Sequence, residues 1–75
     1  MDYRNFFSAR LLLCRKKSAL SQKSLATILG VSDAAITMME RGKRSPSFEI
    51  LCALADFFDV SLDYLVGRSD DPTRH

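Results

Sequence analysis

The sequence predicts a single all-α domain, a compact bundle of five helices. Apolar residues recur at spacings of three and four along most of the chain, whereas the strict alternation typical of strands is absent. Serines and glycines interrupt this pattern at intervals that fit short helices. The 75 residues, 47% of them hydrophobic and 27% charged, are enough for one small core.

Each predicted helix has a local start or stop signal. The first runs from about Asn5 to Lys17, and Asp2 and Asn5 are alternative N-caps. Each of the other four begins at or just after a serine, and the expected ranges are Gln22–Leu29, Asp33–Arg41, Ser47–Phe58 and Leu62–Val66. We expect residues 1–67 to form the domain and residues 68–75, a polar stretch with a proline, to form a flexible tail.

Several classes of protein are disfavoured. No apolar run approaches the roughly 18 residues of a membrane span, and the first residues lack the pattern of a secretory signal, so we expect a cytoplasmic protein. Cys14 and Cys52 form no Cys-x-x-Cys pair, and we interpret both as reduced core thiols, with a disulfide or a metal site as alternatives. Without a Ser–His–Asp set, a metal-ligand cluster or a phosphate-cradling glycine loop, we expect no enzyme activity, metal or cofactor.

Positive charge is concentrated in the first half of the chain. The net charge is only +2, but between Arg10 and Arg44 eight basic residues stand against two acidic ones. From Ser45 to His75 two basic residues stand against six acidic ones. Such a division indicates one surface for a polyanion and another kept away from it, although ordinary solvated helix faces are the alternative explanation.

The segment from residue 21 to residue 41 has the features of a helix-turn-helix motif, in which two short helices are joined by a tight turn. Gly30 suits the left-handed backbone that ends the first of these helices. Ala26 is small enough for the two helices to cross closely. The positions expected to face inward are all apolar: Leu25, Leu29, Val31, Ile36 and Met39.

With the flanking residues, this motif resembles the lambda-repressor and Cro-like (XRE-type) helix-turn-helix domains. The matching positions between about Arg10 and Gly67 are Arg15, Leu20–Gln22, Leu25–Ala26, Leu29–Ser32, Ile36, Glu40–Lys43, Pro46–Ser47 and Val60–Leu65. The resemblance implies a five-helix bundle that binds operator DNA, usually as a dimer, and regulates transcription. From the basic half of the chain and its helix-turn-helix we expect a sequence-specific regulator, a repressor in preference to an activator.

The resemblance also implies roles for individual residues. Arg15 and Glu40 correspond to a structural ion pair, and Gln22 corresponds to a glutamine that grips a backbone phosphate. Ala19 stands where the family often has glycine. If the backbone of Ala19 is left-handed, we expect a cost of about 1 kcal/mol.

We expect the helix from about Ser32 to Arg41 to enter the major groove of double-stranded DNA. The predicted base-facing residues are Ser32, Asp33, Ala34, Ala35, Thr37 and Met38, and the predicted phosphate contacts are Arg10, Gln22, Lys23, Arg41, Lys43 and Arg44. The alanines and Met38 suit thymine methyl groups, and Asp33 suits cytosine N4 or, equally, the positive start of the helix. Because bidentate donors are missing, specificity either depends on DNA shape or is weak.

Some apolar residues exceed the needs of one small core. They are Phe6, Leu12, Leu13 and Phe57. They either thicken the core or, with Leu62 and Tyr64 of the fifth helix, form a homodimer interface that sets two DNA half-sites about 34 Å apart. The apolar character of the recognition helix also leaves open an alternative function, a protein-interaction module such as an antitoxin or an adaptor that binds a protein partner.

Overall fold

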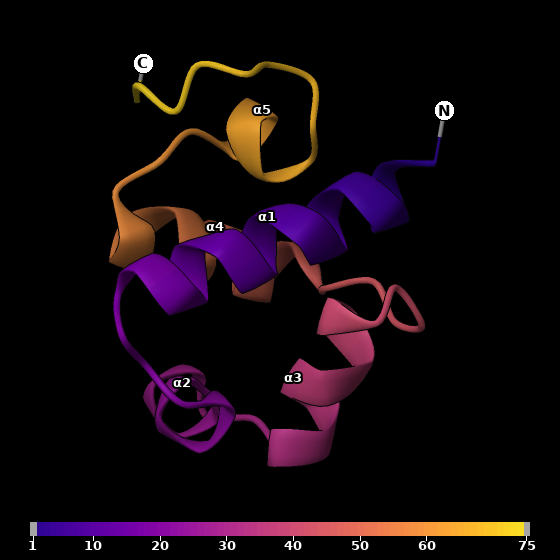
Figure 1. Cartoon of the computed structure of the whole chain (residues 1–75), viewed down its shortest axis with the longest axis vertical. Coiled ribbons are helices and arrows are strands. Elements are labelled where there is room, and N and C mark those ends of the chain that lie inside the picture. The colour runs from indigo at the N-terminus through magenta and orange to yellow at the C-terminus, as the bar shows by residue number, and fades with distance from the viewer. Residues whose placement is uncertain (1, 75) are drawn as a thin grey trace.

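The computed structural model describes residues 2–74, which fold into five α-helices and no strand (Figure 1). Their bounds are α1 Tyr3–Lys17, α2 Gln22–Leu29, α3 Asp33–Glu40, α4 Phe48–Phe58 and α5 Leu62–Leu65. In Figure 1, α1 crosses the middle of the molecule with α4 behind it, α5 lies above it, and α2 and α3 lie below it. The predicted all-α five-helix fold is confirmed.

Serine caps explain where the last four helices begin. The Oγ atoms of Ser21, Ser32, Ser47 and Ser61 each accept a hydrogen bond of 2.9–3.2 Å from the backbone N–H three residues further on. Each bond satisfies a backbone donor that has no partner inside its helix. The first helix begins at Tyr3, two residues earlier than the favoured start, because the Asp2 carboxylate accepts from the N–H of Arg4.

Three left-handed residues set the turns that matter most here. Gly30 ends α2 with φ 71°, as predicted. Ala19, between α1 and α2, has φ 56°, so the condition attached to its predicted cost is met. Asp59, which ends α4 with φ 57°, was not anticipated from the sequence.

The core holds α3 and α5 on different sides of α1. Helix α3 contacts α1 and α2, whereas α5 contacts α1 and α4. The largest side chains with almost no exposed surface come from every helix: Phe7, Leu11, Leu25, Ile36, Leu54 and Leu65. Packing therefore fixes the position of α3 relative to α1 and α2, the helices that it contacts most.

Residues 68–74 fold back onto the bundle, which differs from the loose tail expected from the sequence. The N–H of Ser61 donates to the carbonyl of Pro72 at 3.0 Å, and the N–H of Arg68 donates to the carbonyl of Asp63 at 2.8 Å. The guanidinium of Arg74 lies 2.6 Å from the Asp56 carboxylate. The partners of Pro72 and Arg74 are more than ten residues away along the chain, so local composition does not reveal them. His75, the last residue of the predicted tail, lies outside the described residues.

The two cysteines differ in their surroundings. Both thiols are free, Cys14 is buried and Cys52 is half-buried. Burial raises the pKa of the Cys14 thiol above its ordinary value. Within residues 2–74, no three His, Cys, Asp or Glu side chains are grouped to hold a metal ion, and no helix has the length and apolarity to cross a bilayer.

Candidate nucleic-acid interface

Helices α2 and α3 meet through an apolar seam, and the turn between them is closed by backbone hydrogen bonds. Leu25 and Ile36 have no exposed surface, and Ala26 is 1% exposed where the helices approach. The N–H of Val31 donates to the carbonyl of Ala26 at 3.0 Å, which satisfies a carbonyl at the end of α2. The seam fixes the direction of α3 relative to α2, as a helix-turn-helix requires.

A buried ion pair ties the end of α3 to α1. The Arg15 Nε donates to Glu40 Oε2 at 2.5 Å, and its Nη2 donates to Oε1 at 3.1 Å. A third donor, Nη1, reaches the carbonyl of Leu20 at 2.9 Å. The hydrogen bonds to Glu40 raise the pKa of the Arg15 guanidinium, so it stays charged. This is the pair that the family resemblance implied.

Gln22 extends this polar network across α2 and α3. Its Nε2 donates to Glu40 Oε1 at 2.9 Å, while its Oε1 accepts from the Thr37 hydroxyl at 3.0 Å. An amide nitrogen carries two protons, so one N–H of Gln22 has no partner within residues 2–74. This link between Gln22 and α3 was not predicted from the sequence. The available signal was the spacing of Thr37 and Glu40, which places them on the same side of α3.

The exposed outer face of α3 contains fewer residues than predicted. Asp33, Ala34 and Met38 are exposed, as is the cap Ser32, and Thr37 is half-buried. Ala35 was wrongly assigned to this face, because it is only 4% exposed and belongs to the core. A step of one residue turns an α-helix by about 100°, which carries Ala35 from the exposed face to a buried side of α3.

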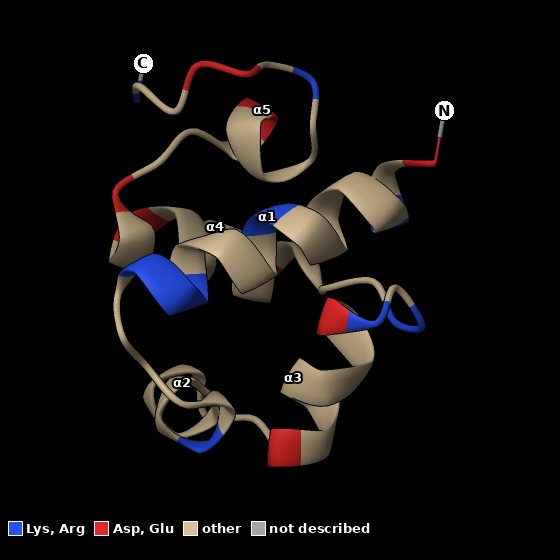
Figure 2. Cartoon of the chain, in the orientation of Figure 1, with Lys and Arg blue, Asp and Glu red and all other residues tan. Residues whose placement is uncertain are grey.

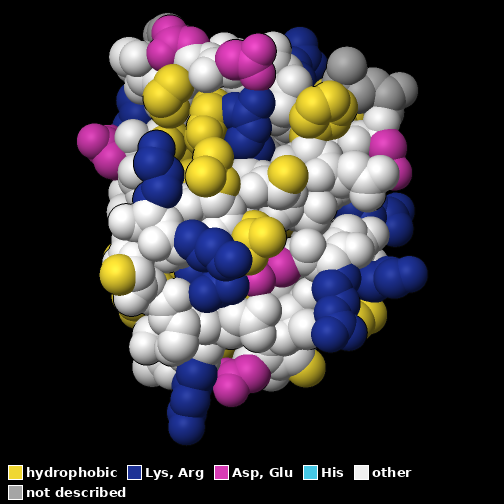
Figure 3. Space-filling model, viewed as in Figure 1, with side chains coloured by type: hydrophobic (Ala, Val, Ile, Leu, Met, Phe, Trp, Pro, Cys, Tyr) yellow, Lys and Arg dark blue, Asp and Glu magenta, His cyan; other side chains and the backbone are white. Residues whose placement is uncertain are grey.

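Four exposed basic residues flank α3 without forming ion pairs in the described part of the chain. Lys23 on α2 and Arg41, Lys43 and Arg44 after α3 are all exposed. None of the four takes part in an ion pair within residues 2–74. Figure 2 shows the basic loop after α3 projecting from the side of the molecule, and Figure 3 shows basic side chains reaching out from the lower and right edges of this face.

Arg10, a predicted phosphate contact, does not belong to this basic group, because its guanidinium is paired at the α5 end of the molecule. Its guanidinium lies 2.7 Å from the Asp70 carboxylate and 4.1 Å from the centre of the Tyr64 ring. Arg10 and Arg15 are five residues apart, which separates them by about 140° around α1. Arg15 therefore faces α3, whereas Arg10 faces α5 and the C-terminal stretch.

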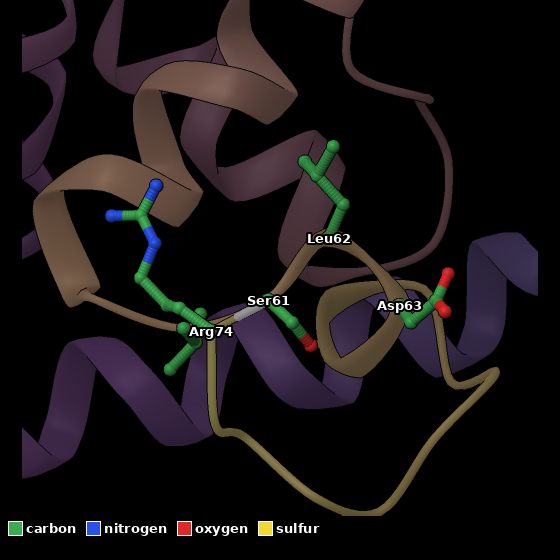
Figure 4. A pocket seen from close by; sticks show the side chains of 5 residues that line it. Ser61, Leu62, Asp63 and Arg74 are labelled. Carbon is green, nitrogen blue, oxygen red and sulfur yellow. The ribbon is translucent and has the colours of Figure 1, made fainter.

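A pocket beside α5, drawn in Figure 4, shows no catalytic arrangement. Val60, Ser61, Leu62, Asp63 and Arg74 line it. The Ser61 hydroxyl caps α5, and the Arg74 guanidinium is paired with Asp56 and Asp59. These polar groups are already occupied by structural contacts, and no activated nucleophile lies among them.

Comparison with other proteins places this geometry among known regulators. A family model described as Helix-turn-helix (HTH_3) matches residues 11–65. The HTH-type transcriptional regulator YqaE of Bacillus subtilis is 41% identical over 66 residues, which is 87% of this chain and 57% of YqaE. Repressor protein C2 of Salmonella phage P22 is 39% identical over 57 residues, which is 76% of this chain and 26% of C2. The chain thus spans little more than half of YqaE and about a quarter of C2.

A solved structure matches over nearly its whole length. The restriction-modification controller protein C.AhdI of Aeromonas hydrophila has a TM-score of 0.73 and 31% identity, and the match covers 83% of this chain and 94% of C.AhdI. The buried seam, the left-handed Gly30 and the Arg15–Glu40 pair agree with these matches. The chain belongs to the lambda-repressor-like (XRE-type) helix-turn-helix family of DNA-binding transcription regulators.

Proposed function

We propose that this protein is a sequence-specific repressor of transcription that places α3 in the major groove of operator DNA. The observation that carries the proposal is the exposed outer face of α3 between unpaired basic residues on α2 and on the loop after α3. An α-helix with its side chains is about 10–12 Å across, so α3 fits a major groove about 12 Å wide. A repressor role is supported by the similarity to the phage P22 repressor protein C2.

In this arrangement the basic residues hold the DNA backbone and α3 meets the bases. Lys23 would contact phosphates on one side of the groove, and Arg41, Lys43 and Arg44 on the other. The remaining N–H of Gln22 would donate to a phosphate near the start of α2. Such contacts release counterions, so affinity should fall steeply with salt. The protein would act in the cytoplasm, where the operator lies, and the proposal assigns it no catalytic step.

We also propose a homodimer, formed around α5. Leu62 on α5 is 41% exposed, and Phe57 on α4 and Phe6 on α1 are 44% and 41% exposed. Burying these side chains against a second copy would remove apolar surface from water. Tyr64, considered for this interface on sequence grounds, is 8% exposed and contributes to the core instead. A two-fold dimer would present two copies of α3 about 34 Å apart.

The direct test is a gel-shift experiment with the DNA upstream of the gene for this protein. We expect a discrete complex at low salt that weakens strongly when the salt concentration is raised. An absence of any complex at low salt would contradict the proposal.

A second candidate function is a protein-interaction module, favoured by Ala34 and Met38, whose apolar side chains are exposed on α3. Apolar contacts at this face would suit a protein partner as well as thymine methyl groups. Ala34→Glu separates the two functions. Loss of a protein partner with unchanged DNA binding would favour this candidate, and loss of DNA binding would favour the regulator.

A further inference from the structure

Helix α3 has no side chain that is free to donate a hydrogen bond to a base. Of its polar residues, Asp33 is a carboxylate that only accepts, and Glu40 is held by Arg15. The remaining polar residue is Thr37, and its hydroxyl proton is donated to Gln22 Oε1 at 3.0 Å. Ahead of the helix, the cap Ser32 accepts from the N–H of Ala35 and keeps its own proton.

The direction of the Thr37 hydrogen bond follows from the ion pair behind it. Because the Glu40 carboxylate can only accept, the amide that approaches it at 2.9 Å must present its nitrogen. The amide oxygen of Gln22 then faces Thr37 and requires a donor. A hydroxyl has a single proton, so the Thr37 hydroxyl has no proton left to donate to a base.

The groups that α3 can offer to a duplex are therefore carbon surfaces and hydrogen-bond acceptors. The carbon surfaces are the Ala34 methyl, the Met38 side chain and the γ-methyl of Thr37, and the acceptor at the start of the helix is Asp33. In the major groove, thymine presents a 5-methyl group, adenine and cytosine present amino donors, and guanine presents two acceptors only. At Ala34, Thr37 and Met38, guanine would place its acceptors against side chains that have no free donor; the one free hydroxyl, that of Ser32, lies ahead of the helix.

We propose that α3 selects its binding site through thymine 5-methyl groups and disfavours guanine at the bases it faces. Gln22 is the positioning residue, because it occupies the Thr37 hydroxyl and leaves the γ-methyl as the group that Thr37 offers to DNA. This inference rests on the proposed DNA-binding function. It assigns specificity to methyl contacts instead of the bidentate hydrogen bonds that arginine, glutamine or asparagine would supply.

The test uses a duplex selected by the protein from a random pool, resynthesised with deoxyuridine in place of thymidine. This change removes only the 5-methyl groups. We expect about fourfold weaker binding for each contacted thymine that is replaced, which is the value of one buried methyl-sized group. Equal affinity for the thymine and uracil duplexes, or selected sites with guanine at the contacted positions, would overturn the inference and leave DNA binding itself intact. Failure to select any duplex would overturn the proposed function as well.

Two substitutions at Thr37 separate the methyl group from the hydroxyl. Thr37→Val keeps the methyl and should retain the preference for thymine over uracil, whereas Thr37→Ser keeps the hydroxyl and should lose the preference at that position. The opposite result would overturn the inference.

Gln22→Ala tests the positioning role. Loss of a phosphate contact alone would weaken binding to thymine and uracil duplexes equally. Release of the Thr37 hydroxyl should instead lower the ratio of the two affinities. An unchanged ratio would show that Gln22 does not position Thr37.

Discussion

The two ends of the molecule use ion pairs in different ways. At the α2–α3 end, the Arg15 and Glu40 side chains are only 13% and 5% exposed and join three helices through one network. At the α5 end, Arg10 and Arg74 pair with carboxylates that are largely in solvent; the Asp70 side chain is 99% exposed. A buried ion pair fixes the positions of the helices it joins, because either charge would be costly to bury without the other. An exposed ion pair mainly balances charge and contributes little to stability.

The comparison also explains where free positive charge remains. Near α5 and the C-terminal stretch, Arg10, Arg68 and Arg74 are paired with aspartates. Around α3 the exposed basic residues have no such partners within the described residues. Within the described residues, the unpaired positive charge between positions 10 and 44 therefore lies around α3 and, at Lys16 and Lys17, on the last turn of α1.

The largest expected difference between the two ends concerns stability. Arg15→Ala leaves the buried Glu40 carboxylate with the neutral Gln22 amide in place of a charged partner, and should cost about 3 kcal/mol of unfolding free energy. Arg10→Ala removes an exposed pair and a contact with the Tyr64 ring, and should cost about 1 kcal/mol. Urea denaturation of both variants measures the two costs, and equal costs would refute the contrast.

The next difference concerns DNA binding. Lys43→Ala at the α3 end should weaken binding to all sequences alike and reduce the slope of log K against log salt by about 0.9, the value of one phosphate contact. Arg68→Ala, at the α5 end, is the matched control and should leave both affinity and slope unchanged. The same loss of slope in both variants would mean that phosphates are not held preferentially near α3.

A smaller difference is expected at the left-handed residues that precede α2 and α5. Ala19→Gly relieves the Cβ strain at φ 56° and should stabilise the protein by about 1 kcal/mol, which raises the melting temperature by about 4 °C or more. Asp59→Gly should stabilise the protein by less than Ala19→Gly does, because aspartate tolerates the left-handed conformation better than alanine. Thermal unfolding monitored by circular dichroism compares them, and a lower melting temperature for Ala19→Gly would contradict the assigned strain.

Local signals in the sequence predicted the elements, and long-range contacts decided the details that were missed. The serine caps and Gly30 act within a few residues, so α2 is found where it was expected. The direction of Arg10 depends on Asp70, sixty residues away, and a sequence pattern does not contain that contact. Ala35 was misplaced because a small residue fits either face of a helix, and only packing against neighbouring helices decides between them.

The polar network was partly predictable. The family resemblance implied the Arg15–Glu40 pair, but the direction of the Gln22 amide requires knowing that Thr37 and Glu40 converge on it. The C-terminal stretch was expected to be loose because its composition is polar, whereas its carbonyl and guanidinium partners lie on α4, on α5 and in the loop between them. A polar composition indicates that a segment is compatible with solvent, but it does not show whether the segment packs against distant parts of the chain.

We propose that the outer face of α3 contacts DNA. Equilibrium binding of a fluorescent duplex by Ala34→Glu tests it most directly, with Thr73→Glu, the same charge placed in the exposed C-terminal stretch, as the control. We expect Ala34→Glu to abolish binding while the fold, monitored by circular dichroism, is retained, and Thr73→Glu to bind as the unmodified protein does. Unchanged binding by Ala34→Glu would contradict the account.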